Sequence, residues 1–177
     1  ARMAIDVLAP APSGLDRETT LALDGGPAAL ASMEGDLVQH ASRGLVRRWR
    51  LGPQRRELNV VESAKLDAPT WPGYRVDENL GPQVSTQDGR LLISTRMRPE
   101  DSTRGGSAVH LRALDFSSGT TVSALREGSY GGARGRRGRW LLFDRTHHVT
   151  LGRTLEEEAR VPFGPGIEID TSWGATP

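Results

Sequence analysis

Short runs of alternating apolar and polar residues, separated by glycine-containing turns, recur along the chain. In VHLRAL (109–114) the two kinds of side chain alternate, which is typical of a half-buried β-strand. The stretch LDFSSGTTV (114–122) places a turn cluster between two such runs. Glycine supplies the positive φ that tight hairpin turns require. The pattern therefore predicts many short antiparallel strands joined by tight turns.

The strand pattern repeats with a period of about fifty residues. Its markers are the turns EGD (34–36), DGR (88–90) and RGR (137–139), and an apolar-rich run follows each of them. Periods of this length are typical of propellers and other repeat arrays. We therefore expect a single all-β domain over residues 1–177, built from repeated four-stranded antiparallel units. The expected units lie at about residues 26–63, 81–127 and 128–164.

Residues 27–49 also fit a helix, because apolar residues recur at near-helical spacing after Pro27. Gly35 and Gly44 each disfavour that helix by roughly 1 kcal/mol relative to alanine. A capping-box pattern in TLEEEAR (154–160) likewise predicts a helical turn as an alternative to a strand. The repetition of the pattern favours strands in both segments.

The stretch DGRLLISTRM, continued by SAVHLRALDFSSGTTVSAL up to residue 125, resembles degenerate bacterial β-propeller repeats of the WD40-like or quinoprotein-like kind. No unit carries the Gly-His opening or the Trp-Asp closing of the consensus repeat. The resemblance implies about three blades of a partial or small β-propeller, and a β-sandwich is the alternative fold. Known propellers close with at least about four blades. We expect AIDVLA (4–9) and GIEIDTSW (166–173) to form a partial fourth blade, unless another chain or a longer precursor supplies it.

The composition excludes several kinds of site. The chain has no cysteine, which rules out disulfides, thiolate metal sites and cysteine nucleophiles. Its formal net charge of +1 gives the whole chain no strong preference for nucleic acid or membrane. Without an apolar run of about 18 residues, no membrane-spanning helix is expected. The start ARMAIDVLAPAP lacks an initiator Met and a signal-peptide layout, so we expect a soluble processed product or fragment of unknown compartment.

No catalytic or metal-binding pattern is present. The chain contains no G-x-S-x-G elbow, P-loop, dinucleotide fingerprint or H-E-x-x-H motif. His147 and His148 are adjacent, so on a strand they point to opposite faces, and His40 and His110 lie in other units. We therefore expect no metal and no cofactor, and a binding protein rather than an enzyme.

The segment GGARGRRGRW (131–140) is the clearest candidate binding site. Flexible Arg-Gly loops bind phosphates through charge and stack on bases, and a neighbouring aromatic ring adds a stacking surface. The loop therefore predicts contact with RNA or another polyanion. The alternative is a solvated loop whose charge the acidic run 156–158 neutralises. The candidate residues are Arg134, Arg136, Arg137, Arg139 and Trp140.

Trp71 and Tyr74 form a second candidate site. They lie in the Pro/Gly-rich connection DAPTWPGYRVDENLGPQ (67–83). Exposed Trp, Tyr and Arg side chains commonly anchor protein interfaces. The connection therefore predicts contact with a protein partner, and a Trp71 that caps the core is the alternative.

A third candidate site lies near the C-terminus. In GIEIDTSW, Glu168 and Asp170 share one face of the expected strand, and paired carboxylates are the catalytic groups of glycosidases. The EID stretch resembles the motif of laminarinase-like glycosidases, but Trp173 occupies the place of that motif's second Glu. The segment therefore predicts a carbohydrate-binding or carbohydrate-active β-sandwich as an alternative.

Together these features predict a non-catalytic binding or assembly module. In this interpretation the strands form the scaffold, and the loops at the blade ends contact a protein partner. We expect the module to act within a larger chain or complex, together with a protein partner or a completing chain. The alternatives are the carbohydrate site and the polyanion or RNA site.

Overall fold

The chain is built from β-strands and divides into two compact units. The computed structural model describes residues 2–12, 14–24, 29–54, 56–101, 103 and 105–167. The units are Ala1–Ala68 and Pro69–Pro177, called here the first and second units. Apart from a 3₁₀ turn at Ser42–Gly44, every regular element in the described residues is a strand. The prediction of an all-β chain is confirmed.

The first unit contains a hairpin and a four-stranded meander. In the hairpin, β1 (Arg2–Ala11) pairs antiparallel with β2 (Gly14–Asp24), which the sequence had not indicated as a strand. In the meander, the order β3-β4-β5-β6 pairs every strand with its sequence neighbours. The helix considered for residues 27–49 is therefore wrong. The strands of the meander are β3 (Ala29–Met33), β4 (Asp36–His40), β5 (Leu45–Leu51) and β6 (Leu58–Lys65).

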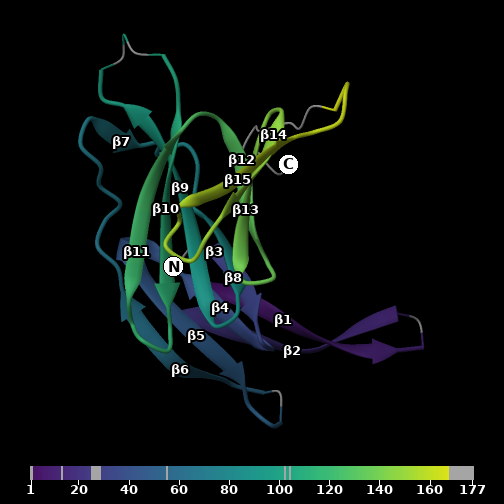
Figure 1. Cartoon of the computed structure of the whole chain (residues 1–177). Helices are drawn as coiled ribbons and strands as arrows, with labels where there is room; N and C mark the ends of the chain where they lie inside the picture. Colours follow the sequence, from purple (N-terminus) through teal and green to yellow (C-terminus); the bar gives the residue numbers. More distant parts are fainter. Residues whose placement is uncertain are drawn as a thin grey trace. The chain divides into compact units, whose positions relative to one another are not determined.

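The second unit contains two antiparallel sheets (Figure 1). In the first, called the β8–β11 sheet, the order is β11-β10-β9, and β7 and β8 pair with different parts of the free edge of β9. Its strands are β7 (Tyr74–Val76), β8 (Gln83–Gln87), β9 (Arg90–Pro99), β10 (Ala108–Asp115) and β11 (Thr121–Glu127).

The second of these sheets, the β12–β15 sheet, has the order β12-β13-β14-β15. Its last strand covers most of residues 154–160, so the helical turn considered there is wrong. Its strands are β12 (Tyr130–Arg136), β13 (Arg139–Asp144), β14 (His147–Leu151) and β15 (Glu157–Pro162).

The β3–β6, β8–β11 and β12–β15 meanders have the same kind of turn between their first and second strands. Two consecutive residues with positive φ form a type I′ turn, whose twist matches that of the flanking strands. Glycine occupies the second place in each turn because it adopts positive φ without steric cost. The turn residues are Glu34 (51°) and Gly35 (85°), Asp88 (48°) and Gly89 (70°), and Arg137 (49°) and Gly138 (78°).

The two sheets of the second unit pack against each other around one hydrophobic core. Each large apolar side chain buried there contributes roughly 1.5–3 kcal/mol to stability. The core residues are Leu92, Val109, Leu111 and Ala113 from the β8–β11 sheet, and Tyr130, Trp140, Leu142, Val149, Leu151 and Leu155 from β12–β15 and its last turn.

β10 is buried on both faces, which differs from the expectation of a half-buried strand. Every side chain from Ala108 to Leu114 is buried. One face belongs to the core shared with the β12–β15 sheet, and the opposite face excludes solvent as well. The polar residues His110 and Arg112 consequently lie in the interior. Polar and apolar residues therefore alternate along β10, but buried and exposed residues do not.

The partial fourth blade falls largely outside the described residues. The expected strand over residues 166–173 begins with a described turn at 166–167, and residues 168–177 are not described. Among the described residues, the N-terminal strand β1 pairs only with β2.

Candidate binding face of the β12–β15 sheet

The segment 131–140 is a strand, a type I′ turn and the start of a second strand, and the expectation of a flexible loop is wrong. Gly135 of this segment allows β12 to pack closely against β8. A Cβ atom on Gly135 would lie 2.5 Å from Cβ of Gln87 and 2.9 Å from the carbonyl oxygen of Thr86. The backbone N–H of Gly135 also donates to Oγ of Ser85 over 3.2 Å. Glycine therefore lets β12 approach β8, and it does not mark mobility.

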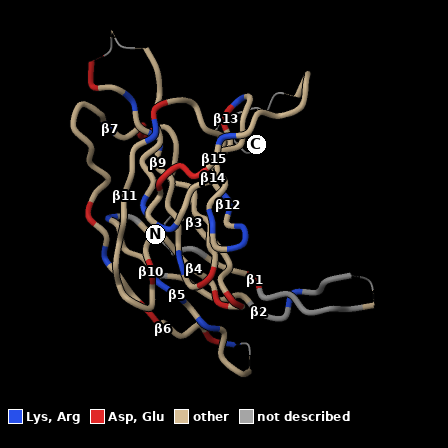
Figure 2. The backbone as a smooth tube through the Cα atoms, in the orientation of Figure 1, with Lys and Arg blue, Asp and Glu red and all other residues tan. Residues whose placement is uncertain are grey.

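The arginines of this hairpin are exposed, and they gather on the side of the sheet away from the core. On β12, Arg134 and Arg136 stand opposite Leu141 and Arg139 of β13. Because side chains alternate between faces, these four residues share the face opposite that of the buried Trp140 and Leu142. Figure 2 shows the basic positions along β12 and its turn. The remaining arginine, Arg137, lies in the turn itself.

Only one of these arginines has an acidic partner among the described residues. Nε of Arg139 lies 2.6 Å from Oε2 of Glu158. The side chains of Arg134, Arg136 and Arg137 form no ion pair or hydrogen bond within the described part of the chain. The acidic run 156–158 therefore neutralises the hairpin only in part, and three exposed guanidinium groups have no partner among the described residues.

Apolar and weakly polar side chains continue the same face across β13, β14 and β15. Phe143 stands opposite His148, whose ring centroid lies 6.1 Å from that of Phe163. Val161 of β15 is 44% exposed, although it is a large hydrophobic residue. We call this surface the outer face. It consists of Arg134, Arg136, Arg139, Leu141, Phe143, His148, Thr150, Ala159 and Val161.

Trp140 belongs to the core, and the expectation that it offers a stacking surface is wrong. Its side chain is 2% exposed and packs with Leu142 and Leu151. The repeat alignment contains the signal for this burial, because Trp140 follows the turn glycine at the same distance as the buried Leu91. Large apolar residues at this place in the unit face the interior.

A pocket of about 190 Å³ lies between the turns of the two sheets of the second unit. Within it, Arg90 is 8% exposed and donates from Nη2 to the carbonyl oxygen of Arg153 over 2.5 Å. Its Nε is 4.0 Å from Oδ2 of Asp115. Arg90 therefore ties the β14–β15 turn to β9, which is a structural role. The lining residues are Gln87, Asp88, Arg90, Gly138, Trp140 and Arg153.

Trp71 and Tyr74 both have partners inside the second unit. They form an isolated β-bridge with each other. The Trp71 ring meets the His110 ring edge-on at a centroid distance of 5.5 Å. The Tyr74 hydroxyl donates to Oε1 of Glu127 over 2.7 Å. Both side chains thus contribute to the fold, and the structure does not bring them together with the outer face.

His110 is a buried titratable group without a hydrogen-bond partner for either ring nitrogen among the described residues. It is 3% exposed and stands opposite Thr95, whose hydroxyl is also buried and unpaired. Burial, together with the charge of Arg112, lowers the pKa of His110 to about 4. The imidazole is therefore neutral at pH 7.

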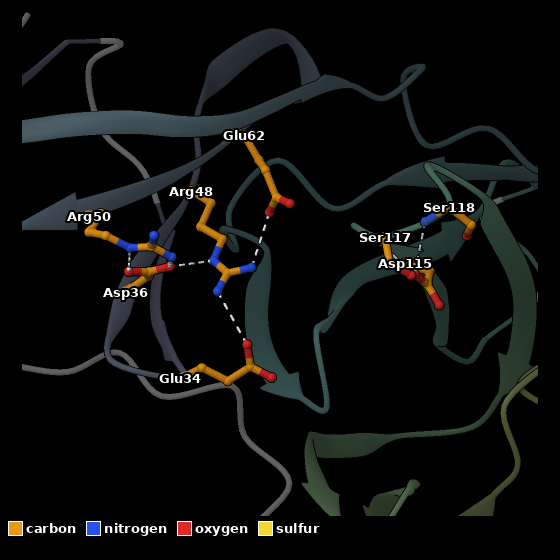
Figure 3. A network of polar contacts seen from close by, with 8 residues as sticks. All are labelled: Glu34, Asp36, Arg48, Arg50, Glu62, Asp115, Ser117 and Ser118. Carbon is orange, nitrogen blue, oxygen red and sulfur yellow. Dashed lines mark hydrogen bonds and ion pairs between the residues drawn. The ribbon is translucent and has the colours of Figure 1, made fainter.

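The first unit contains a dense network of ion pairs (Figure 3). Asp36 is 5% exposed and accepts hydrogen bonds from Nε of Arg48 over 2.6 Å and from Nε of Arg50 over 2.9 Å. Arg48 also donates to Glu62 and Glu34, each over 3.2 Å. The hydrogen bonding of Arg50, together with the hydrogen bond from Arg48, lowers the pKa of Asp36 although burial opposes this shift. The network joins β4, β5 and β6 and gives each nitrogen of the Arg48 guanidinium group an acidic partner.

Figure 3 also shows the turn after β10, where Asp115 caps the chain reversal. Its Oδ1 accepts from the hydroxyl of Ser117 over 2.6 Å and from the N–H of Ser118 over 3.2 Å. The Ser117 hydroxyl bond is the main cause of the lowered pKa of Asp115. The turn cluster predicted at residues 117–119 is therefore present, and its side chains stabilise the turn itself.

The carbohydrate candidates Glu168, Asp170 and Trp173 lie outside the described residues. Among the residues that are described, no three His, Asp or Glu side chains are grouped so as to hold a metal ion. That part of the chain also contains no helix long and apolar enough to cross a membrane. No protein-family model matches the chain, and no curated protein matches it in sequence.

Proposed function

We propose that the chain is a non-catalytic binding module whose outer face and β12–β13 turn contact an acidic surface of a protein partner. The observation that carries the proposal is the set of exposed guanidinium groups of Arg134, Arg136 and Arg137, which have no partner among the described residues. They stand next to the half-buried apolar side chains of Leu141 and Phe143. Arginine and aromatic residues beside apolar surface are the composition that distinguishes the centre of protein interfaces.

The scaffold also favours binding. Arg134 and Arg136 project from a strand that is hydrogen-bonded along β13 and packed on β8. Their backbone is therefore already ordered, and association costs mainly the ordering of the side chains. Guanidinium groups form two parallel hydrogen bonds with a carboxylate, which adds geometric specificity to charge attraction.

A protein partner is favoured over RNA because the aromatic rings described on the outer face, Phe143 and His148, are half-buried and lie beyond Leu141, away from the turn with its arginines. Sequence-tolerant binding of single-stranded RNA uses aromatic platforms together with a basic groove. Trp140, the aromatic residue next to the hairpin turn, is buried in the core. RNA contact through the same arginines is therefore an outcome that the test must separate from protein binding.

The test is site-specific photo-cross-linking in cells that produce the protein naturally. A photoreactive amino acid replaces Thr150 on the outer face, and a matched variant carries it at Ser123, an exposed position of β11. We expect one defined protein to be attached at the Thr150 position and not at the Ser123 position. The purified partner should then bind the unmodified chain, and Arg134→Glu with Arg136→Glu should weaken that binding. A nucleic acid at the Thr150 position, or the same products from both positions, would contradict the proposal.

A further inference from the structure

The two sheets of the second unit follow the same plan, so positions on them can be matched. Leu92 and Leu141 are each the third residue after the turn glycine, Gly89 or Gly138. In both sheets the strand order after the turn is the same, and the next strand pairs antiparallel. Residues that occupy the same place after the turn therefore face the same side of their sheet.

By this matching, the outer face corresponds to the face of the β8–β11 sheet that lies under the β12–β15 sheet. Leu92 and Leu111 of that covered face are fully buried. Their counterparts on the outer face, Leu141 and His148, are only half-buried. In the described part of the second unit, the face of the β8–β11 sheet thus has a sheet docked on it, and the matching face of the β12–β15 sheet has none.

The polar edge of the covered face shows how a docked sheet is held. Ser85 accepts the N–H of Gly135 over 3.2 Å, and Gln87 lies against the same glycine. Arg90 donates to a backbone carbonyl of the docked sheet over 2.5 Å, and Arg126 does the same over 2.6 Å. These side chains recognise the backbone of the strand and turn that lie across from them.

The corresponding edge of the outer face carries arginines instead. Counted from the turn glycine, Arg134 takes the place of Ser85, and Arg136 that of Gln87. Arg139 takes the place of Arg90. Long cationic donors at these places suit an occupant with acidic side chains or free carbonyl groups at its facing edge. The outer face therefore has the apolar centre of a sheet-docking surface and a more basic edge.

We propose that the partner contacts this surface with an antiparallel β-sheet of its own, packed face to face as β12–β15 packs on β8–β11. The docked sheet has an apolar centre over Leu141 and Phe143, and acidic groups opposite Arg134 and Arg136. This inference rests on the proposed function, because it names the kind of partner surface that occupies the same face.

A docked sheet makes a prediction that a bound loop or peptide does not. Neighbouring strands lie about 4.8 Å apart, so β13 to β15 span roughly 10 Å across the sheet. A facing sheet covers all three strands at once. A peptide added to the free edge covers β15 alone, and a contact limited to the arginines covers only the hairpin end.

The test is a cysteine footprint, which the natural absence of cysteine makes free of background. Single variants Leu141→Cys, Thr150→Cys and Ala159→Cys report on β13, β14 and β15, and Arg137→Cys reports on the turn. Ser123→Cys on β11 is the exposed control. Each variant is labelled with a thiol-reactive reagent in the native complex and as the isolated chain. Thermal unfolding of the isolated variants verifies that each one folds.

We expect labelling at the Leu141, Thr150 and Ala159 positions to slow on the order of tenfold or more in the complex, because the reagent then reacts only after local opening. Labelling at Ser123 should not change. Protection at the Arg137 position alone leaves the proposed function intact and overturns the sheet proposal. Protection confined to Ala159 overturns it in favour of edge pairing.

Two further outcomes also overturn the inference. If none of the outer-face positions is protected in the complex, the proposed function and the sheet proposal both fail. If the positions are already protected in the isolated chain, the chain covers its own outer face and no partner sheet is needed there.

Discussion

The arginines of β5 and those of β12 lie on comparable hairpin strands, yet the structure uses them in opposite ways. Arg48 and Arg50 both bind the buried carboxylate of Asp36. Arg134 and Arg136 are exposed and have no partner among the described residues. The difference lies in what the neighbouring strands offer. An exposed arginine is therefore a good candidate for binding a partner only if no Asp or Glu of its own chain lies close enough to pair with it.

Cross-strand neighbours explain this contrast. β4 and β6 flank β5 and supply Asp36 and Glu62 on the face of Arg48. β12 is an edge strand of its sheet, and β13 places leucine and arginine opposite its two arginines. Opposite charges across strands stabilise a sheet, whereas like charges do not. Within the described part of the chain, the β12 arginines therefore form no ion pair whose loss would lower stability.

The largest effect on stability is expected from Asp36→Ala, which removes the carboxylate at the centre of the first unit's ion-pair network. We expect the free energy of unfolding of the first unit to fall by about 3 kcal/mol, since the change removes the buried carboxylate that the largely buried Arg48 binds. Hydrogen exchange in β4 and β5, measured across a urea series, reports this change. The control Asp101→Ala removes an exposed carboxylate whose hydrogen bonds, among the described residues, go to Thr103, and it should be nearly neutral. A loss no larger than that of the control would show that the network is dispensable.

The two units should also differ in how their stability depends on pH. The second unit buries His110 as a neutral base, whereas the first unit buries Asp36 as a charged acid. The pKa of His110 is about 4, below its ordinary value of 6.5, so the unfolded state binds more protons. Stability of the second unit should therefore fall as pH drops below about 6.5, by about 2.5 kcal/mol at pH 4.5. The lowered pKa of Asp36 keeps its contribution intact above about pH 4 and loses it only below that value.

The measurement is urea unfolding of the second unit at several pH values, in the natural chain and in His110→Leu. The leucine variant should lack the decline between pH 6.5 and 4.5. An equal decline in both chains would assign the pH dependence to other groups.

A smaller effect is expected from Arg139→Ala, which breaks an exposed ion pair. Arg139 is 61% exposed and Glu158 is 33% exposed, so solvent screens their attraction. We expect the free energy of unfolding to fall by less than about 1 kcal/mol. Urea unfolding of the variant and of Glu158→Ala measures this, and a larger loss would place the pair among the structural networks.

The smallest effect on stability is expected from Arg134→Glu combined with Arg136→Glu. The free energy of unfolding should stay within about 0.5 kcal/mol, as for surface residues without partners. Binding to the cross-linked partner should nevertheless weaken about tenfold or more, because charge reversal opposes an acidic surface. Isothermal titration measures the binding. Arg75→Glu, an exposed charge reversal on β7, is the matched control and should bind normally.

The hairpin turns were the most predictable part of this fold. Gly35, Gly89 and Gly138 mark type I′ turns because few other residues adopt positive φ cheaply, so this signal does not depend on tertiary contacts. The strands that follow these turns were predictable for the same local reason. The repetition of the pattern then decided between strand and helix where a single segment was ambiguous.

The candidate site was predictable only in part, because tertiary packing decides what glycine and tryptophan do. The arginines of residues 134–139 were identified, but the glycines between them indicated a loop. In the fold, Gly135 is required by the approach of β8, and Trp140 turns into the core. The burial of His110 was not predictable either, since the alternation within one strand does not show that its polar face is buried as well.

The meander topology has a consequence for how the chain reaches its native state. Within the described residues, almost every strand pairs with the strand next to it in the sequence, so most ladders close over short loops. Closing short loops costs little entropy, and topologies rich in local contacts fold quickly. The β3–β6 meander can therefore complete its hydrogen bonds without any strand of the second unit. Among the described strands, β7 is the exception, because it pairs with β9 and β8 lies between them in the sequence.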